Sequence, residues 1–131
     1  LSNITNLITK DLSTRKIKLK NSKILILGIS YKKNVDDLRE SASLRLIKIL
    51  QRKKVKKLDY SDPYHKNFIK TRSLIMNKKG IKISPKNIKK YDIVILMTDH
   101  DKFNYNLIYK NSKKIIDTRG VFMTNNKVIR G

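Results

Sequence analysis

The sequence of 131 residues predicts an α/β domain in which a doubly wound parallel sheet lies between two layers of helices. Short apolar runs rich in Ile, Leu and Val recur along the chain, as in strands that a parallel sheet buries on both faces. Segments with helical periodicity lie between those runs, and strands that alternate with helices pair in parallel through right-handed crossovers. The length suits one core of this kind.

The amino-terminal segment is expected to be an amphipathic helix over residues 1 to about 13, followed by a polar linker through Ser22. Its apolar residues recur at helical spacing: Leu1, Ile4, Leu7, Ile8 and Leu12. Because the chain starts inside this pattern, we expect it to be a piece of a longer protein.

A strand, a helix and a second strand are expected next. Residues 23–28 form an apolar run that ends in Gly28, which is typical of a buried parallel strand. Residues 41–52 have the period of a helix, with these residues on one face: Ala42, Leu46, Ile47 and Leu50. The second strand, over residues 55–60, is ended by Ser61-Asp62-Pro63, because proline holds the residue before it extended.

The middle of the chain is polar and rich in lysine over residues 64–80, which predicts a long loop with one helical turn. Residues 81–83 are expected to form a short strand. Ser84 is placed to cap a brief helix that begins at Pro85, and residues 92–98 form the next apolar run, typical of a buried strand.

The carboxyl-terminal part is expected to add a helix over residues 104–110 and a strand over residues 113–117. Residues 121–123 and 127–129 flank Thr124-Asn-Asn126, a pattern that predicts a hairpin at the sheet edge. The predicted architecture is therefore Rossmann-like, with three α/β/α layers and a C-terminal edge hairpin.

The formal net charge of +22 and the pI near 10.3 are values often found in nucleic-acid binders. The lysines, however, are spread along the whole chain among many Ile and Asn residues, as expected of an AT-biased genome. The six tyrosines also form no recurring platform for stacked bases. We therefore favour a charge that reflects composition, and keep a basic nucleic-acid-binding module as the alternative.

The chain has no cysteine, which excludes a disulfide, a thiolate zinc site and a cysteine nucleophile within it. His65 and His100 have no carboxylate cluster at ligand spacing, so no metal site is predicted. No apolar run approaches the ~20 residues that span a bilayer, and the first residues lack the apolar region of a secretory signal. We expect a cytoplasmic protein with no membrane segment.

A ligand cleft is expected beyond the carboxyl ends of the strands, where doubly wound sheets bind their ligands. Three segments that follow apolar runs should converge there: residues 30–33, 98–100 and 117–119. Lys32, Lys33 and Arg119 would then lie near the N-terminus of the helix after Ser41, an arrangement suited to an anion. The alternative is that these cations are only solvated.

Two other patterns concern the same region. Asp37-Leu-Arg-Glu40 has the spacing of a capping box, so Asp37 and Glu40 have either a structural role or a role in the cleft. The sequence from Gly28 to Lys33 lacks the second glycine of the dinucleotide fingerprint. This domain is therefore not expected to hold NAD by itself in the usual way.

Four motifs resemble, in order, the C-terminal domain of the UDP-glucose/GDP-mannose dehydrogenase family. The first is Ile26-Leu-Gly-Ile-Ser-Tyr-Lys-Lys-Asn-Val-Asp-Asp-Leu-Arg-Glu-Ser41. The second is Tyr60-Ser-Asp-Pro-Tyr64, the third is Tyr91-Asp-Ile-Val-Ile-Leu-Met-Thr-Asp-His100, and the fourth is Ile116-Asp-Thr-Arg119. Together they cover most of residues 20 to 120.

The resemblance implies an enzyme that oxidises the sugar C6 alcohol of a nucleotide sugar to a carboxylate with NAD, for surface polysaccharide synthesis. Family members carry the catalytic cysteine and the dinucleotide site in other domains, so this chain would hold no catalytic residue and be inactive alone. The resemblance implies that Tyr31 and Lys32 contact the sugar nucleotide and that Arg119 reaches its diphosphate or sugar. Arg39 looks like the residue that reaches across the domain cleft to NAD.

The resemblance also divides the chain into residues 1–20, the end of an interdomain helix with its linker, and residues 21–131, the UDP-sugar-binding C-terminal domain. The missing N-terminal and central domains would be its partners, in a homo-oligomer when full length. The Tyr-Lys-Lys-Asn-Val-Asp-Asp sequence that begins at Tyr31 looks most like dehydrogenases of UDP-N-acetylglucosamine or UDP-N-acetylmannosamine. A UDP-glucose 6-dehydrogenase fragment stays as an alternative, and Ala42 departs from the proline that relatives often have.

Overall fold

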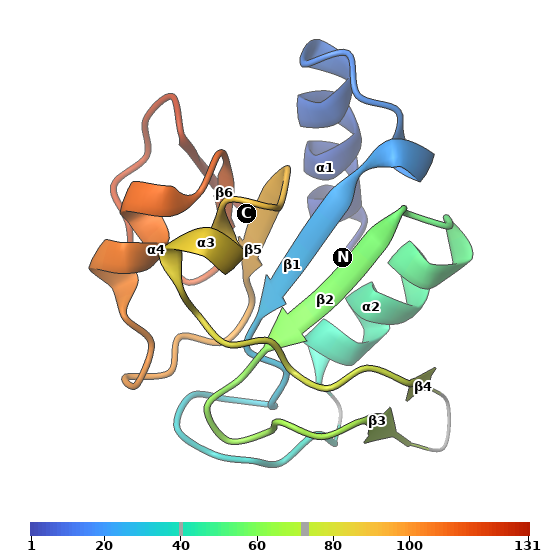
Figure 1. The fold of residues 1–131 in the computed structure, drawn as a ribbon, viewed down its shortest axis with the longest axis vertical. Coiled ribbons are helices and arrows are strands. Elements are labelled where there is room, and N and C mark those ends of the chain that lie inside the picture. Colours follow the sequence, from blue (N-terminus) through green and yellow to red (C-terminus); the bar gives the residue numbers. More distant parts are fainter. Residues whose placement is uncertain (40, 72–73) are drawn as a thin grey trace.

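The computed structural model describes residues 1–39, 41–71 and 74–131 and confirms the predicted α/β class (Figure 1). One sheet contains these five strands: β1 (Lys23–Leu27), β2 (Lys57–Ser61), β5 (Ile93–Leu96), β6 (Ile115–Asp117) and β7 (Val128–Arg130). Their order is β2-β1-β5-β6-β7, and all four pairings are parallel. After β2 the chain crosses to the other side of β1, so the sheet is doubly wound and its strand order reverses between β1 and β5.

Helices cover both faces of this sheet. They are α1 (Ser2–Thr14), α2 (Ala42–Arg52), α3 (Pro85–Ile88) and α4 (Tyr105–Asn111), with a 3₁₀ turn, η1 (Leu19–Asn21), before β1. Ile24 and Ile26 belong to a core cluster with α1 and α2, whereas Leu25 and Leu27 belong to a second cluster with α3 and α4. This alternation along one strand gives the predicted three layers. No helix in the described ranges is long and apolar enough for a membrane span.

Local sequence explains where several helices begin. The hydroxyl of Ser84 accepts a hydrogen bond from the Asn87 N–H at 3.1 Å, which confirms the predicted cap of α3. Asn104 caps α4 in the same way through the Leu107 N–H. Ser41 precedes α2 but caps nothing, because its hydroxyl donates to the Ile29 carbonyl at 2.6 Å.

The outer edge of β2 is partly covered by the segment that returns from the loop after it. Lys78 donates from Nζ to the Leu58 carbonyl at 3.3 Å, and the Ile81 N–H donates to the Tyr60 carbonyl at 2.8 Å. Of residues 81–83, only Ile81 donates a backbone hydrogen bond to β2, and a single bond does not make a strand pairing. The prediction of a strand over these residues is therefore wrong.

The loop predicted over residues 64–80 contains no helical turn in its described part. Two short strands pair there instead, β3 (Ile69–Lys70) and β4 (Ile75–Met76), in antiparallel register. The side chains of Ile69 and Met76 are buried in the same cluster as α1 and α2. Long-range packing therefore fixes this segment.

The predicted C-terminal hairpin is also wrong, because β7 is a single strand parallel to β6. The Asp117 carboxylate turns the chain away from the edge by accepting three backbone N–H bonds, from Arg119, Gly120 and Phe122. The Phe122 ring then packs against Tyr105 and Tyr109. Residues 121–123 are thus held on the helix side and cannot pair with β7.

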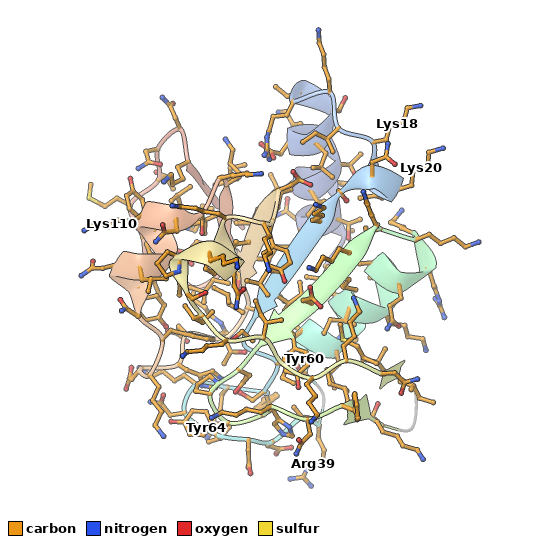
Figure 2. All side chains as sticks on the ribbon, viewed as in Figure 1. Lys18, Lys20, Arg39, Tyr60, Tyr64 and Lys110 are labelled. Carbon is orange, nitrogen blue, oxygen red and sulfur yellow. The ribbon has the colours of Figure 1, made fainter. Side chains whose placement is uncertain are left out.

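Cationic side chains lie at well-separated places around the outline of the molecule in Figure 2. Lys18 and Lys20 flank the amino-terminal end of β1, Lys110 lies on α4, and Arg39 lies at the opposite end of the sheet. The charge therefore does not form a single patch, which agrees with the spread of lysines along the sequence.

Candidate functional site

Three loops meet at the carboxyl ends of β1, β2 and β5, around the side chain of His100. His100 is fully buried, and its Nε2 lies 3.1 Å from the Ser30 hydroxyl and 2.9 Å from Oδ2 of Asp62. The hydroxyl of Thr98 donates to the Ser30 carbonyl at 3.0 Å. The predicted convergence of the segments after β1 and β5 is therefore confirmed, and the loop after β2 joins them.

The hydrogen bonds of His100 define its tautomer. Its Nδ1 accepts from the Asn34 N–H at 2.8 Å, so the proton of the neutral ring is on Nε2 and is donated toward Asp62. The Ser30 hydroxyl donates to the Lys32 carbonyl at 3.0 Å. Ser30 and Asp62 thus share one nitrogen, which is not the arrangement of a nucleophile and its base. The cluster ties loops together.

Asp62 is the acidic member of this cluster. Its Oδ2 accepts from His100 and from the Ile29 N–H at 2.8 Å, and its Oδ1 accepts from the Tyr64 N–H. Burial by itself would raise the pKa of Asp62, but these hydrogen bonds outweigh burial and hold the pKa of the carboxyl below its usual range. Asp62 is therefore a buried carboxylate with fixed partners.

Tyr31 and Lys32 lie on the anchored loop after β1. The Tyr31 N–H donates to the Asp37 carbonyl at 2.6 Å, while the Tyr31 side chain is 53% exposed and Lys32 is exposed. The backbone is thus held by the His100 cluster, and the two side chains predicted to contact substrate face outward.

Arg119 lies on the loop after β6, next to this cluster. It is exposed, and its Nε donates to the Met97 carbonyl at 2.8 Å. Met97 precedes Thr98, whose hydroxyl bonds to Ser30 just before Tyr31. Through these bonds the structure brings the loop of Arg119 to the loop of Tyr31 and Lys32.

Arg39 forms a two-pronged ion pair with Asp37. Its Nε and Nη2 lie 3.1 and 3.0 Å from the two carboxylate oxygens, and its own N–H also donates to the same carboxylate. Asp37 therefore does not cap a helix, since α2 begins only at Ala42; Glu40 lies outside the described residues. The side-chain hydrogen bond from Arg39 holds the pKa of Asp37 below its usual range.

Replacing Arg39 with alanine is expected to raise the pKa of Asp37 toward its ordinary range, because the ion pair and its hydrogen bonds are lost. In the wild type the ion pair persists until the pH falls through the lowered pKa of Asp37. Carboxyl ¹³C NMR titration measures this pKa. Arg52→Ala is the matched control, since Arg52 lies at the other end of α2; an unchanged midpoint in Arg39→Ala would contradict the pairing.

At the point where strand order reverses, Gly28 packs closely against Thr98. Gly28 has φ +85°, and a Cβ placed on it would come 2.5 Å from Cβ and 2.6 Å from the carbonyl oxygen of Thr98. The glycine serves close packing of two loops, whereas a Rossmann glycine lets the backbone approach a ligand. The residues of this chain therefore do not fit NAD as a complete site.

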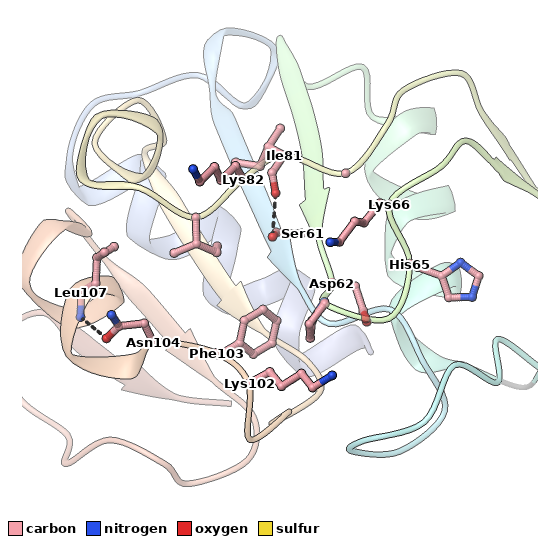
Figure 3. Close-up of a pocket in the computed structure, with 13 residues that line it drawn as sticks. Ser61, Asp62, His65, Lys66, Ile81, Lys82, Lys102, Phe103, Asn104 and Leu107 are labelled. Atoms are coloured by element: carbon pink, nitrogen blue, oxygen red, sulfur yellow. Dashed lines mark hydrogen bonds between the residues drawn. The ribbon is translucent and has the colours of Figure 1, made fainter.

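Two cavities differ in how they relate to the predicted site residues. One, of about 520 Å³, lies between the loop after β2, residues 80–83 and residues 102–107 (Figure 3). None of the four predicted site residues lines it. Arg39 instead lines a cavity of about 760 Å³ together with residues of α2.

The UDP binding domain model of the UDP-glucose/GDP-mannose dehydrogenase family matches residues 25–124. The chain belongs to this family. The matched span contains all four loops described above, so the predicted motifs of this UDP binding domain lie together at the carboxyl ends of its strands.

This UDP binding domain is similar to parts of several dehydrogenases. It is 28% identical to the NDP-N-acetyl-D-galactosaminuronic acid dehydrogenase of Ralstonia solanacearum, over 80% of this chain and 24% of that protein. It is 29% identical to the UDP-N-acetyl-D-mannosamine dehydrogenase of Methanococcus vannielii, over 93% of this chain and 28% of that protein. Among solved structures, UDP-D-ManNAc dehydrogenase from Pyrococcus horikoshii superposes with a TM-score of 0.72 at 26% identity, covering 95% of this chain and 28% of that one.

The chain thus spans about a quarter of the length of these relatives. The structure places Tyr31, Lys32 and Arg119 after the strands where sequence reasoning expected them. That reasoning also expected the segment 98–100 at the cleft, but it did not predict that His100 would be buried and bonded to Asp62. The available signal was the position of Asp62 and His100 directly after two predicted strands, which brings both to one edge of the sheet.

Proposed function

We propose that this chain is the sugar-nucleotide-binding part of an NAD-dependent 6-dehydrogenase that oxidises a UDP-N-acetylhexosamine to the uronate, for surface polysaccharide synthesis. The family match supports the class of enzyme. The two curated relatives named above both carry N-acetyl sugars in their names, which supports an N-acetylhexosamine over glucose. A UDP-glucose dehydrogenase stays the alternative substrate assignment.

In this proposal Tyr31, Lys32 and Arg119 bind the sugar nucleotide. The observation that carries the proposal is the hydrogen-bonded path from Arg119 through Met97, Thr98 and Ser30, which ties the two loops together. Exposed cations on anchored loops suit a diphosphate, because a guanidinium can bind two phosphate oxygens at once. Because these loops are already ordered, they lose less conformational entropy when the ligand binds.

Arg39 is proposed to contact NAD that another part of the enzyme holds. When bound, NAD would accept the hydride; this chain would position the sugar nucleotide and supply no catalytic residue. The domain division at residue 20, a homo-oligomeric full-length enzyme and a cytoplasmic location belong to the same proposal.

Arg119→Ala is expected to weaken UDP binding about tenfold, the loss of ~1.4 kcal/mol that one charge-assisted contact supplies. Calorimetric titration of the chain with UDP and with UDP-N-acetylglucosamine, at fixed moderate salt, measures the effect. Arg52→Ala removes the same charge at the opposite end of the sheet and should leave affinity unchanged.

The same titration separates the rival function, a basic nucleic-acid-binding module supported by the net charge of +22. Nucleic-acid binding should weaken steeply with salt and show no preference for UDP. Equal losses in Arg119→Ala and Arg52→Ala, with no uridine preference, would favour that rival over a sugar-nucleotide site.

A further inference from the structure

The cavity of about 520 Å³ beside the end of β2 has the size and lining of a small-molecule site. Its walls come from three separate segments: residues 61–66, residues 80–83 and residues 102–107 (Figure 3). Apolar groups supply much of the lining: Pro63, Ile81, Ile83, Phe103 and Leu107. Phe103 is buried, and its ring packs against that of His100, with the two ring centroids 5.6 Å apart. The His100 cluster therefore holds this wall in place.

The charged groups of the cavity are predominantly cationic. Lys66, Lys82 and Lys102 line it from three different segments, and none forms an ion pair with a carboxylate in the described ranges. Lys102 is held at the wall by the Tyr64 ring, with Nζ 4.8 Å from its centroid. The acid among the lining residues, Asp62, has both oxygens bonded to His100, Ile29 and Tyr64, and it forms no ion pair with any of the three lysines.

Two uncharged polar groups of the wall have partners within the chain. The Ser61 hydroxyl donates to the Ile81 carbonyl at 2.8 Å, and Oδ1 of Asn104 accepts from the Leu107 N–H. A ligand would therefore meet mainly the lysines and the apolar wall, with Nδ2 of Asn104 as an additional donor. This combination fits a ligand that joins a flat apolar ring to a phosphate.

We propose that this cavity binds a small anionic ring compound of the nucleoside monophosphate class, with its ring against Phe103 and its phosphate between Lys66 and Lys102. Figure 3 shows these two side chains entering from the loops after β2 and after β5. Tyr31, Lys32, Arg39 and Arg119 do not line the cavity, so this site is additional to the proposed sugar-nucleotide site.

NMR titration of the ¹⁵N-labelled chain with AMP tests the proposal, with adenosine and inorganic phosphate as partial ligands. AMP should shift the amide signals of Phe103 and Lys66, and both partial ligands should bind more weakly. The double variant Lys66→Gln/Lys102→Gln should weaken AMP binding about tenfold. Lys20→Gln/Lys110→Gln removes the same two charges from surfaces outside the cavity, and should leave AMP affinity within about twofold of wild type.

Three outcomes would overturn the inference: equal weakening in both double variants, AMP shifts confined to residues around Tyr31 and Arg119, or no AMP binding. Arg119→Ala distinguishes this inference from the proposed function. That variant should lose UDP affinity and keep the AMP shifts at Phe103. Loss of AMP binding in Arg119→Ala alone would show that AMP occupies the sugar-nucleotide site.

Discussion

Replacing His100 with alanine is expected to lower the free energy of unfolding by about 3 kcal/mol. The change removes the N–H that the buried Asp62 carboxylate receives and the acceptor that the Asn34 N–H uses. A buried charge that loses its partner cannot recover hydration, so the cost exceeds that of one ordinary hydrogen bond. Urea unfolding followed by circular dichroism measures the difference.

His65→Ala is the matched control, because His65 is the only other histidine and has a single bond, from Nε2 to the Asp36 carbonyl, at an exposed site. It should cost less than about 1 kcal/mol. If the two variants lose the same stability, the His100 cluster does not hold the loops as described. His100→Ala should also weaken UDP binding, since the loop of Tyr31 and Lys32 loses its anchor.

Gly28→Ala is expected to lower the free energy of unfolding by about 3 kcal/mol or more. A Cβ at this position would lie 2.5 to 2.8 Å from three atoms of Thr98, two of which are backbone. The positive φ of Gly28 adds strain of its own for any residue with a Cβ. Thermal or urea unfolding measures the loss.

Gly120→Ala isolates the contribution of the clash. Gly120 also has a positive φ, +76°, but its added Cβ would meet only Nη1 of Arg130 at 2.7 Å, which is the movable end of a side chain. This variant should cost about 1 to 2 kcal/mol from backbone strain. Equal losses in the two glycine variants would show that the loops at Gly28 can separate at little cost.

The fold could be predicted from sequence wherever local patterns agree with burial. Apolar runs located β1 and β5, and the period of α2 and the cap at Ser84 located helices. The failures lie where long-range contacts decide. The turn made by the Asp117 carboxylate and the packing of Phe122 replace the expected hairpin, and burial of Ile69 and Met76 produces β3 and β4.

The sequence predicted where the candidate site residues lie in the fold, but not which contacts hold their loops together. Motifs at strand ends located Tyr31, Lys32 and Arg119, because a parallel sheet brings such ends to one edge. The sequence did not indicate that Asp62 and His100 would form the buried link between those loops. It also did not indicate the lysine-lined cavity, whose walls combine three segments that lie far apart in the sequence.

The hydrogen bonds that cover the outer edge of β2 affect whether copies of this highly charged chain aggregate at high concentration. An edge strand normally offers unpaired carbonyls on which a second copy can add a strand, which begins aggregation. Here the Leu58 carbonyl accepts a hydrogen bond from the Lys78 ammonium, and the Tyr60 carbonyl accepts one from the Ile81 N–H. Association through this edge would have to displace both, so the fold protects itself from sheet-to-sheet polymerisation on that side.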